Sequence, residues 1–75
     1  ASDIRLKKNI DLVGQSDSGI NIYEWNYIWG GGRYRGAMAQ ELLEVHPEAV
    51  SETAGYYAVN YDKIDVDFQQ VNVGG

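Results

Sequence analysis

The chain has 75 residues, of which 44% are hydrophobic, with no cysteine, one histidine and a formal net charge of −5. A chain of this length forms one domain at most, so we expect residues 1–75 to be a single domain. The composition excludes disulfides and a zinc site made of several cysteine and histidine ligands, and the acidic balance argues against nucleic-acid binding.

No stretch approaches the roughly 20 apolar residues that span a membrane, so we expect no membrane partner. A domain this small has little stability to spare from its own core. Because disulfides and zinc are excluded, self-association is the remaining common source of extra stability. We therefore expect an oligomer, with no cofactor.

The first third of the chain is predicted to be extended. Apolar residues at positions 4, 6, 10 and 12 fit an extended segment better than a helix. Residues 15–19 are polar and predict a turn. Residues 20–29 have a period of two and are rich in β-branched and aromatic side chains, which predicts a strand.

Three consecutive glycines, residues 30–32, separate that strand from the next. They lack the Gly-Lys-Ser/Thr sequence that follows in phosphate-binding loops, so a hairpin connection is the better interpretation. Residues 33–39 are predicted to form the second strand. Within it, Gly36 and the small residues Ala37 and Ala39 permit close approach of another part of the chain.

The second half alternates short helices and strands. Residues 40–45 predict a helix with Leu42 and Leu43 on its apolar face, ended by His46-Pro47. Residues 48–51 are expected to be extended and to form a hairpin with a third strand, residues 56–61.

The end of the chain is predicted to be helical. Ile64, Phe68 and Val71 fall at helical spacing, and Asp62 is a candidate N-cap for a helix over residues 63–71. Residues 73–75 are expected to be frayed. The predicted fold class is therefore α+β, a small and mostly antiparallel sheet with one or two short helices.

The N-terminal segment holds a possible catalytic pair, Ser2 and Lys7. A serine hydroxyl can attack a carbonyl while a neutral lysine takes its proton, and the nearest peptide bond would be the chain's own, at or beside Ala1–Ser2. The alternative from spacing alone is that Ser2 is a turn or N-cap residue and that Lys7 belongs to a solvated basic face with Arg5 and Lys8.

Other groupings carry weaker signals. Glu41, Glu44 and Glu48 resemble solvent-facing charges more than an acid–base pair, and the aspartates at 62, 65 and 67 lack the glycine and terminal glutamate of a calcium loop. We expect no metal site. The aromatic residues are either core or a platform for a sugar, an alternative that remains open here; they are Trp25, Tyr27, Trp29 and Tyr34.

The order of motifs along the chain resembles a known family. The blocks are Ser2-Asp3-x-Arg5-Leu6-Lys7-x-Asn9-Ile10, Ile22-Tyr23-x-Trp25-x-Tyr27, Gly36-x-Met38-Ala39-Gln40-Glu41-Leu42-Leu43, Pro47-x-Ala49-Val50 and Gly55-Tyr56-x-x-Val59-Asn60-Tyr61. Together they resemble the C-terminal intramolecular chaperone domain of phage endosialidase tailspikes and tail fibres, a self-cleaving Ser/Lys peptidase family. The cleavage domain of a membrane-anchored myelin regulatory factor is similar.

This resemblance implies an autoproteolytic chaperone that forms a homotrimer, assists folding of the upstream stalk of its own precursor, and then cuts itself off. It implies that Ser2 is the nucleophile and Lys7 the general base, and that the chain is part of a virion tail fibre precursor, made and cleaved in the host bacterial cytoplasm. It assigns no role to Asp3, Arg5 or Asn9, and it implies structural positions at Gly36, Gln40, Pro47 and Tyr61. We expect the aromatic strand to offer surface for the trimer, with Ser2 and Lys7 near a subunit interface.

Two alternatives to this function remain. One is a trimerisation or capping module of the same fold that does not cleave. The other is a glycan-binding fibre tip that uses Trp25, Trp29 and Tyr34.

Overall fold

The computed structural model describes residues 1–71. Its elements are the 3₁₀ turn η1 (Ile4–Leu6), β1 (Lys7–Gln15), β2 (Asn21–Tyr27), β3 (Arg33–Gly36), α1 (Ala39–Val45), the 3₁₀ turn η2 (Pro47–Ala49), β4 (Val50–Thr53), β5 (Tyr56–Val59), the 3₁₀ turn η3 (Tyr61–Lys63) and β6 (Gln69–Val71). The expected fraying of residues 73–75 lies outside the described residues.

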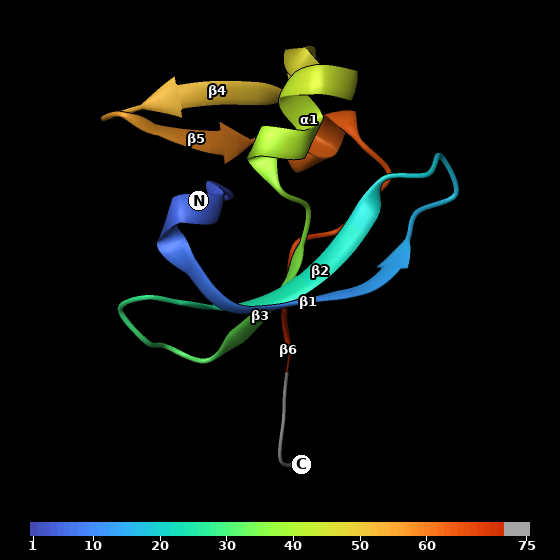
Figure 1. Cartoon of the computed structure of the whole chain (residues 1–75). Coiled ribbons are helices and arrows are strands. Elements are labelled where there is room, and N and C mark those ends of the chain that lie inside the picture. Colours follow the sequence, from blue (N-terminus) through green and yellow to red (C-terminus); the bar gives the residue numbers. More distant parts are fainter. Residues whose placement is uncertain (72–75) are drawn as a thin grey trace.

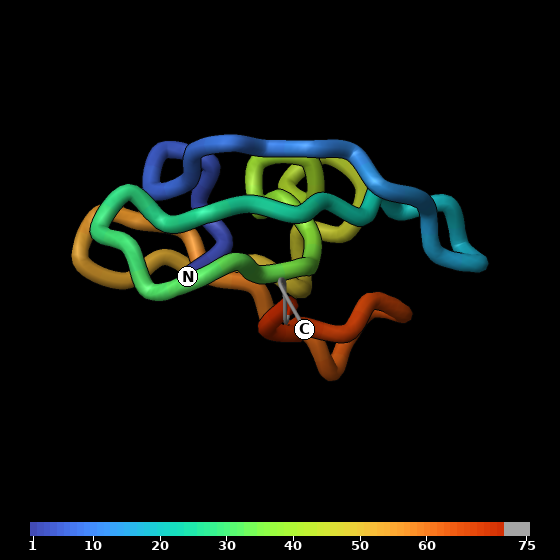
Figure 2. The backbone as a smooth tube through the Cα atoms, turned by 90° about the horizontal axis from the view of Figure 1, so that it is seen from below, coloured from blue at the N-terminus to red at the C-terminus, as the bar shows by residue number. Residues whose placement is uncertain are grey.

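The strands form one antiparallel sheet of order β1-β2-β3-β6 and a separate hairpin of β4 and β5. Figure 1 shows α1 and the β4–β5 hairpin on one side of the larger sheet, with the N-terminal turn between the hairpin and the sheet. In Figure 2, β1, β2 and β3 run side by side and the C-terminal segment follows the β3 side. The predicted α+β class with a mostly antiparallel sheet is confirmed.

The long first strand is bent at Asn9. The pairing of β1 with β2 is irregular between Lys8 and Asp11, and Asn9 has a φ of 53°. Asparagine tolerates this left-handed conformation better than most residues, because its short side chain can bond locally. Its Nδ2 donates to Asn26 Oδ1 at 3.3 Å, and its carbonyl accepts from Arg33. Asn9 therefore shapes β1.

The core has two parts. One gathers under α1 around Ile20, Ala37, Leu42 and Val66. The other consists of Trp25, Tyr27 and Met38, with Leu6 of η1 among the side chains packed against it. The N-terminal turn therefore rests on the second cluster, whose aromatic rings come from β2.

Most of the predicted elements in the first two thirds are confirmed with shifted bounds. The exception is Ile4–Leu6, which forms the 3₁₀ turn η1 and is not extended, because Asp3 caps this turn by accepting from the Arg5 N–H. The strand within residues 20–29 is β2, the glycines lie in the β2–β3 connection, and the helix is α1. Residues Glu48 and Ala49 are in a 3₁₀ turn and not extended, because Pro47 at its first position favours a tight turn. Leu43 is 38% exposed, whereas Ala39 and Leu42 are buried.

The predicted helix over residues 63–71 is wrong. The chain makes the short turn η3, capped by Asn60 and not Asp62, and then becomes β6, which pairs with β3. Pairing with the free edge of β3 satisfies the backbone of this segment. Val66, which interrupts the helical stripe, is buried in the core, and Phe68 stacks on Tyr34 at 5.4 Å between ring centroids.

The aromatic strand is also used differently from our expectation. Trp25 and Tyr27 are buried within a single chain, so they are not free to form a surface between subunits. Trp29 is 63% exposed and Ile28 is 55% exposed. Any apolar surface left for self-association therefore comes from side chains such as these.

Candidate active site

The N-terminal turn brings Ser2 and Lys7 together in the interior. Ser2 precedes η1 and Lys7 is the first residue of β1, so the single 3₁₀ turn reverses the chain between them. Both residues are buried, and Lys7 Nζ donates to the main-chain oxygen of Ser2 at 3.1 Å. The pair that the sequence predicts is therefore in contact, through the backbone of Ser2.

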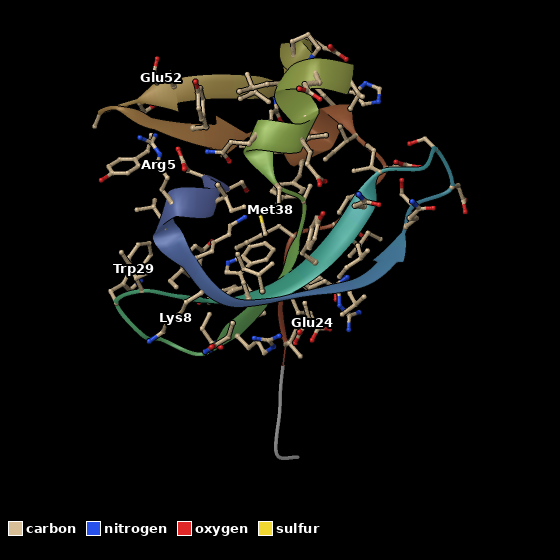
Figure 3. The ribbon with its side chains drawn as sticks, in the orientation of Figure 1. Arg5, Lys8, Glu24, Trp29, Met38 and Glu52 are labelled. Carbon is tan, nitrogen blue, oxygen red and sulfur yellow. The ribbon has the colours of Figure 1, made fainter. Side chains whose placement is uncertain are left out.

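The ammonium group of Lys7 lies in an apolar, carbonyl-lined position. Nζ donates to Ala37 O at 3.1 Å, lies 3.4 Å from Met38 Sδ and sits 3.6 Å from the centre of a Trp25 ring. Figure 3 shows Met38 between the sheet and the N-terminal turn. Burial lowers the pKa of Lys7 to about 7, although the negative charge of Asp3 acts to raise it.

A neutral lysine suits this environment. A neutral amine has two N–H groups and one lone pair. The carbonyls of Ser2 and Ala37 can accept the two N–H groups, and the third acceptor of Nζ, Met38 Sδ, is a weak one. The lone pair is then left to accept a proton. With a pKa of about 7, a substantial fraction of Lys7 is in this form at neutral pH.

The hydroxyl of Ser2 is held by Tyr61. Ser2 Oγ and Tyr61 Oη are 3.0 Å apart, and Tyr61 Oη also accepts from the Ala37 N–H at 3.0 Å. Burial raises the pKa of Tyr61, so the phenol keeps its proton. Either hydroxyl can be the donor in the hydrogen bond between Ser2 and Tyr61.

Among the described residues, no hydrogen bond joins Ser2 Oγ to Lys7 Nζ. The nitrogen contacts the carbonyl of Ser2, and the hydroxyl contacts Tyr61. The Ser2 carbonyl also accepts from the Ala39 N–H at 2.9 Å. The main chain of Ser2 is thus fixed from two sides, while the rotation of its side chain decides whether Oγ meets the amine.

Asp3 anchors the turn. It is fully buried, and its carboxylate accepts from the Arg5 side chain, Gln40 Nε2 and the Tyr57 N–H at 2.7–3.0 Å. It also caps η1 by accepting from the Arg5 N–H at 2.9 Å. The Arg5 guanidinium is the main reason that the pKa of Asp3 lies far below its usual range. The main-chain and Gln40 donors lower this pKa further, whereas burial alone would raise it.

This network ties three elements together. Gln40 of α1 donates to Asp3 and accepts from the Ile4 N–H at 2.9 Å, and Arg5 also donates to Gly55 O in the β4–β5 turn at 2.8 Å. Figure 3 shows Arg5 reaching from the N-terminal turn toward this hairpin. Asp3 and Arg5, to which the sequence analysis assigned no role, therefore fix the turn that carries Ser2 and Lys7.

The peptide bond preceding Ser2 is also held. Tyr27 Oη donates to the Ala1 carbonyl oxygen at 2.7 Å. A pocket of about 170 Å³ opens beside it, lined by Ala1, Ser2, Ala58, Val59, Tyr61 and Phe68. Sequence reasoning treated Tyr27 as part of an aromatic surface and Tyr61 as structural. The only sequence signals for them were their places in the motif blocks.

Comparison with protein families decides the classification. Residues 2–51, well over half of the chain, match a peptidase family described as the chaperone of endosialidase. The chain belongs to this family. Comparisons with curated proteins and with solved structures found no match.

The endosialidase-chaperone match covers part of the site. It includes Ser2, Lys7, Tyr27 and α1, and it ends in β4. Tyr57, Tyr61 and β6 lie beyond it, although Tyr61 contacts Ser2 directly. The family match thus agrees with the resemblance that the motif blocks indicated. The structure adds residues from the last third of the chain to the candidate site.

Several side chains of the other candidate groups make local contacts within the described residues. Glu41 accepts from Tyr23 Oη at 2.6 Å, and Asp65 accepts from Ser18. Within residues 1–71, no cluster of three or more acidic, histidine or cysteine side chains could hold a metal ion. None of the helices described there is long and apolar enough to cross a membrane. Trp25 is fully buried and is not accessible to a glycan.

Proposed function

We propose that this chain is an autoproteolytic intramolecular chaperone that cleaves itself, once and in cis, between Ala1 and Ser2. Membership of the endosialidase-chaperone family supports the chaperone role and the setting of a phage tail fibre or tailspike precursor. The observation that carries the cleavage proposal is the buried Lys7, whose pKa is lowered to about 7 and whose Nζ lies 3.1 Å from the Ser2 carbonyl.

The chemistry favours the bond before Ser2 over the bond after it. Attack of Ser2 Oγ on the Ala1 carbonyl carbon closes a five-membered ring, whereas attack on its own carbonyl would close a strained four-membered ring. In the proposed reaction the Oγ proton passes to Lys7 Nζ, the Oγ–carbon bond forms, and the bond from that carbon to the Ser2 nitrogen breaks as the nitrogen receives the proton.

The product of this step is an ester between Ala1 and Ser2 Oγ. Water then attacks the ester carbon, the bond to Oγ breaks, and the fragment beginning with Ser2 is released. Lys7 can serve as the base in both steps because it is neutral between them. No cofactor is required.

We further propose that the chain acts as a homotrimer on the upstream stalk of its own precursor, in the cytoplasm of the host bacterium. Little stability is available to so small a domain alone, which supports self-association. Release of the domain would leave the folded stalk kinetically trapped.

A non-cleaving trimerisation module is the second candidate. It is favoured by one observation, that Ser2 Oγ is bonded to Tyr61 and not to Lys7. In a cleaving domain, rotation of the Ser2 side chain would have to bring the hydroxyl to the amine.

The two candidates are separated by a precursor that carries its natural stalk. We expect it to release a fragment whose first residue is Ser2, as read by N-terminal sequencing. Ser2→Ala should fold and assemble but remain full length on a denaturing gel, while Ser51→Ala, at an exposed serine of β4, should cleave normally. Cleavage of the Ser2→Ala precursor at the native rate would rule out Ser2 as the nucleophile.

A further inference from the structure

Tyr27 holds the carbonyl group that the proposed reaction attacks. Its Oη donates to the Ala1 oxygen at 2.7 Å, the usual distance of a well-formed O–H···O hydrogen bond. Tyr27 is 5% exposed, so little water competes with its hydroxyl for the Ala1 carbonyl oxygen. The contact joins residues 26 positions apart in the sequence.

The register of the sheet explains the contact. Lys7 of β1 and Tyr27 of β2 are direct cross-strand partners. Opposed residues in an antiparallel pair project to the same face, so both side chains extend under the N-terminal turn. Lys7 Nζ reaches the Ser2 carbonyl and Tyr27 Oη reaches the Ala1 carbonyl, the two carbonyls that flank the Ser2 nitrogen and α-carbon.

The ring of Tyr27 is held in place by other aromatic rings. It meets Trp25 edge to face with centroids 6.0 Å apart, and it stacks on Trp29 at 4.6 Å with an interplanar angle of 5°. Tyr34 packs against it at 5.2 Å. A donor fixed in this way needs no reorganisation when charge develops on its acceptor.

The hydroxyl also keeps its proton at neutral pH. Burial raises the pKa of Tyr27, with an opposing effect of the Trp25 side chain. The indole Nε1 of Trp25 is the one buried side-chain nitrogen or oxygen in residues 1–71 without a hydrogen-bond partner. The protonated phenol of Tyr27 is therefore available as a donor to the Ala1 carbonyl oxygen.

We propose that Tyr27 is the oxyanion-stabilising residue of the self-cleavage. This inference rests on the proposed function and extends it. When Ser2 Oγ bonds to the Ala1 carbonyl carbon, the carbonyl electron pair moves onto the oxygen, and the Tyr27 hydroxyl donates to the resulting oxyanion. The charge returns to the carbonyl when the bond to the Ser2 nitrogen breaks, and the same donor serves the tetrahedral intermediate of ester hydrolysis.

The test measures the rate of self-cleavage in the full precursor after assembly. Tyr27→Phe removes only the hydroxyl and keeps the ring, so trimer content and melting temperature should change little. The rate should fall about 100-fold, the usual effect of losing one oxyanion donor. Tyr34→Phe is the matched control, because its ring packs in the same cluster, and it should cleave at the native rate.

A second measurement separates catalysis from a structural role. A fluorinated tyrosine placed at position 27 keeps the shape of the side chain but is a stronger donor, so cleavage should accelerate while the phenol remains protonated. A native rate for either Tyr27→Phe or the fluorinated variant overturns the inference. If Tyr27→Phe fails to fold, the fluorinated variant decides alone.

The Ser2→Ala precursor distinguishes a failure of the proposed function from a failure of the role proposed for Tyr27 alone. If Ser2→Ala is inert and Tyr27→Phe cleaves at the native rate, the proposed function stands and the role of Tyr27 is wrong. If Ser2→Ala itself cleaves at the native rate, the proposed function fails and the oxyanion role fails with it.

Discussion

Gly36 lies so close to Tyr61 that a β-carbon at position 36 would collide with the tyrosine hydroxyl. It would also come within 3.0 Å of the Trp25 ring. The absence of a side chain in β3 therefore lets Tyr61, 59 residues from Ser2, reach the serine hydroxyl. The sequence expectation that Gly36 permits close approach is confirmed, and the approaching group is a phenol.

Gly36→Ala should therefore disturb both stability and cleavage. The added methyl group must displace Tyr61 or Trp25, and overpacking of this kind costs about 1–3 kcal/mol in the free energy of unfolding. Denaturant unfolding and cleavage of the precursor would measure both effects. Gly14→Ala is the control, since nothing lies within 4 Å of a β-carbon there. Equal stability and equal cleavage for the two variants would contradict the role assigned to Gly36.

The rate of self-cleavage should rise with pH through about 7 and level off above it. The active form of Lys7 is the neutral amine, and its pKa is lowered to about 7 by burial. Lys7→Arg should abolish cleavage because arginine stays protonated, whereas Lys8→Arg, at an exposed position, should cleave normally. A flat profile between pH 6 and 9 would exclude Lys7 as the base.

The lowered pKa of Lys7 also predicts how the free energy of unfolding depends on pH. Between about 7 and the ordinary lysine value of 10.5, the unfolded chain binds a proton that folded Lys7 does not. The free energy of unfolding should therefore rise with pH in this window. Lys7→Met should remove that part of the slope. An identical slope in native and Lys7→Met domains, measured by chemical denaturation, would show that Lys7 does not carry the effect.

Asp3→Asn should destabilise the N-terminal turn. The Asp3 carboxylate accepts five hydrogen bonds from Arg5, Gln40 and Tyr57, and an amide cannot accept all of them. We expect a loss of about 2 kcal/mol in the free energy of unfolding. Because the folded pKa is depressed, this stabilisation is present above the usual aspartate range and lost in strong acid. Asp17→Asn, at an exposed turn position, should be neutral; an equal loss there would refute the prediction.

The proposed trimer should depend on exposed apolar side chains beside the site. Ile28 is 55% exposed, and its N–H donates to the Leu6 carbonyl at 3.0 Å, next to the N-terminal turn. Ile28→Asp should lower trimer content in light scattering and slow cleavage at the same concentration. Val45→Asp, at the similarly exposed end of α1, should do neither.

Two results would count against this assembly. One is a stable monomer at micromolar concentration. The other is full-rate cleavage of a precursor shown to be monomeric, which would remove any coupling between assembly and the reaction.

Local sequence pattern determined most of the elements. The alternation in residues 20–29 specifies β2 because its side chains fit a pleated surface with one buried face. The short apolar run before His46-Pro47 specifies α1 in the same local way. Ser2 and Lys7 could be paired from sequence because only one turn separates them.

Tertiary structure decided the rest. The apolar residues within 64–71 have helical spacing. The chain is nevertheless extended at β6, because pairing with the free edge of β3 and stacking of Phe68 on Tyr34 outweigh the local helical pattern. Tyr27 and Tyr61 reach Ala1 and Ser2 across 26 and 59 residues. Their positions depend on sheet register and on the space left by Gly36, which no local pattern encodes. The lowered pKa of Lys7 is likewise a product of burial, so it exists only once the chain has folded around it.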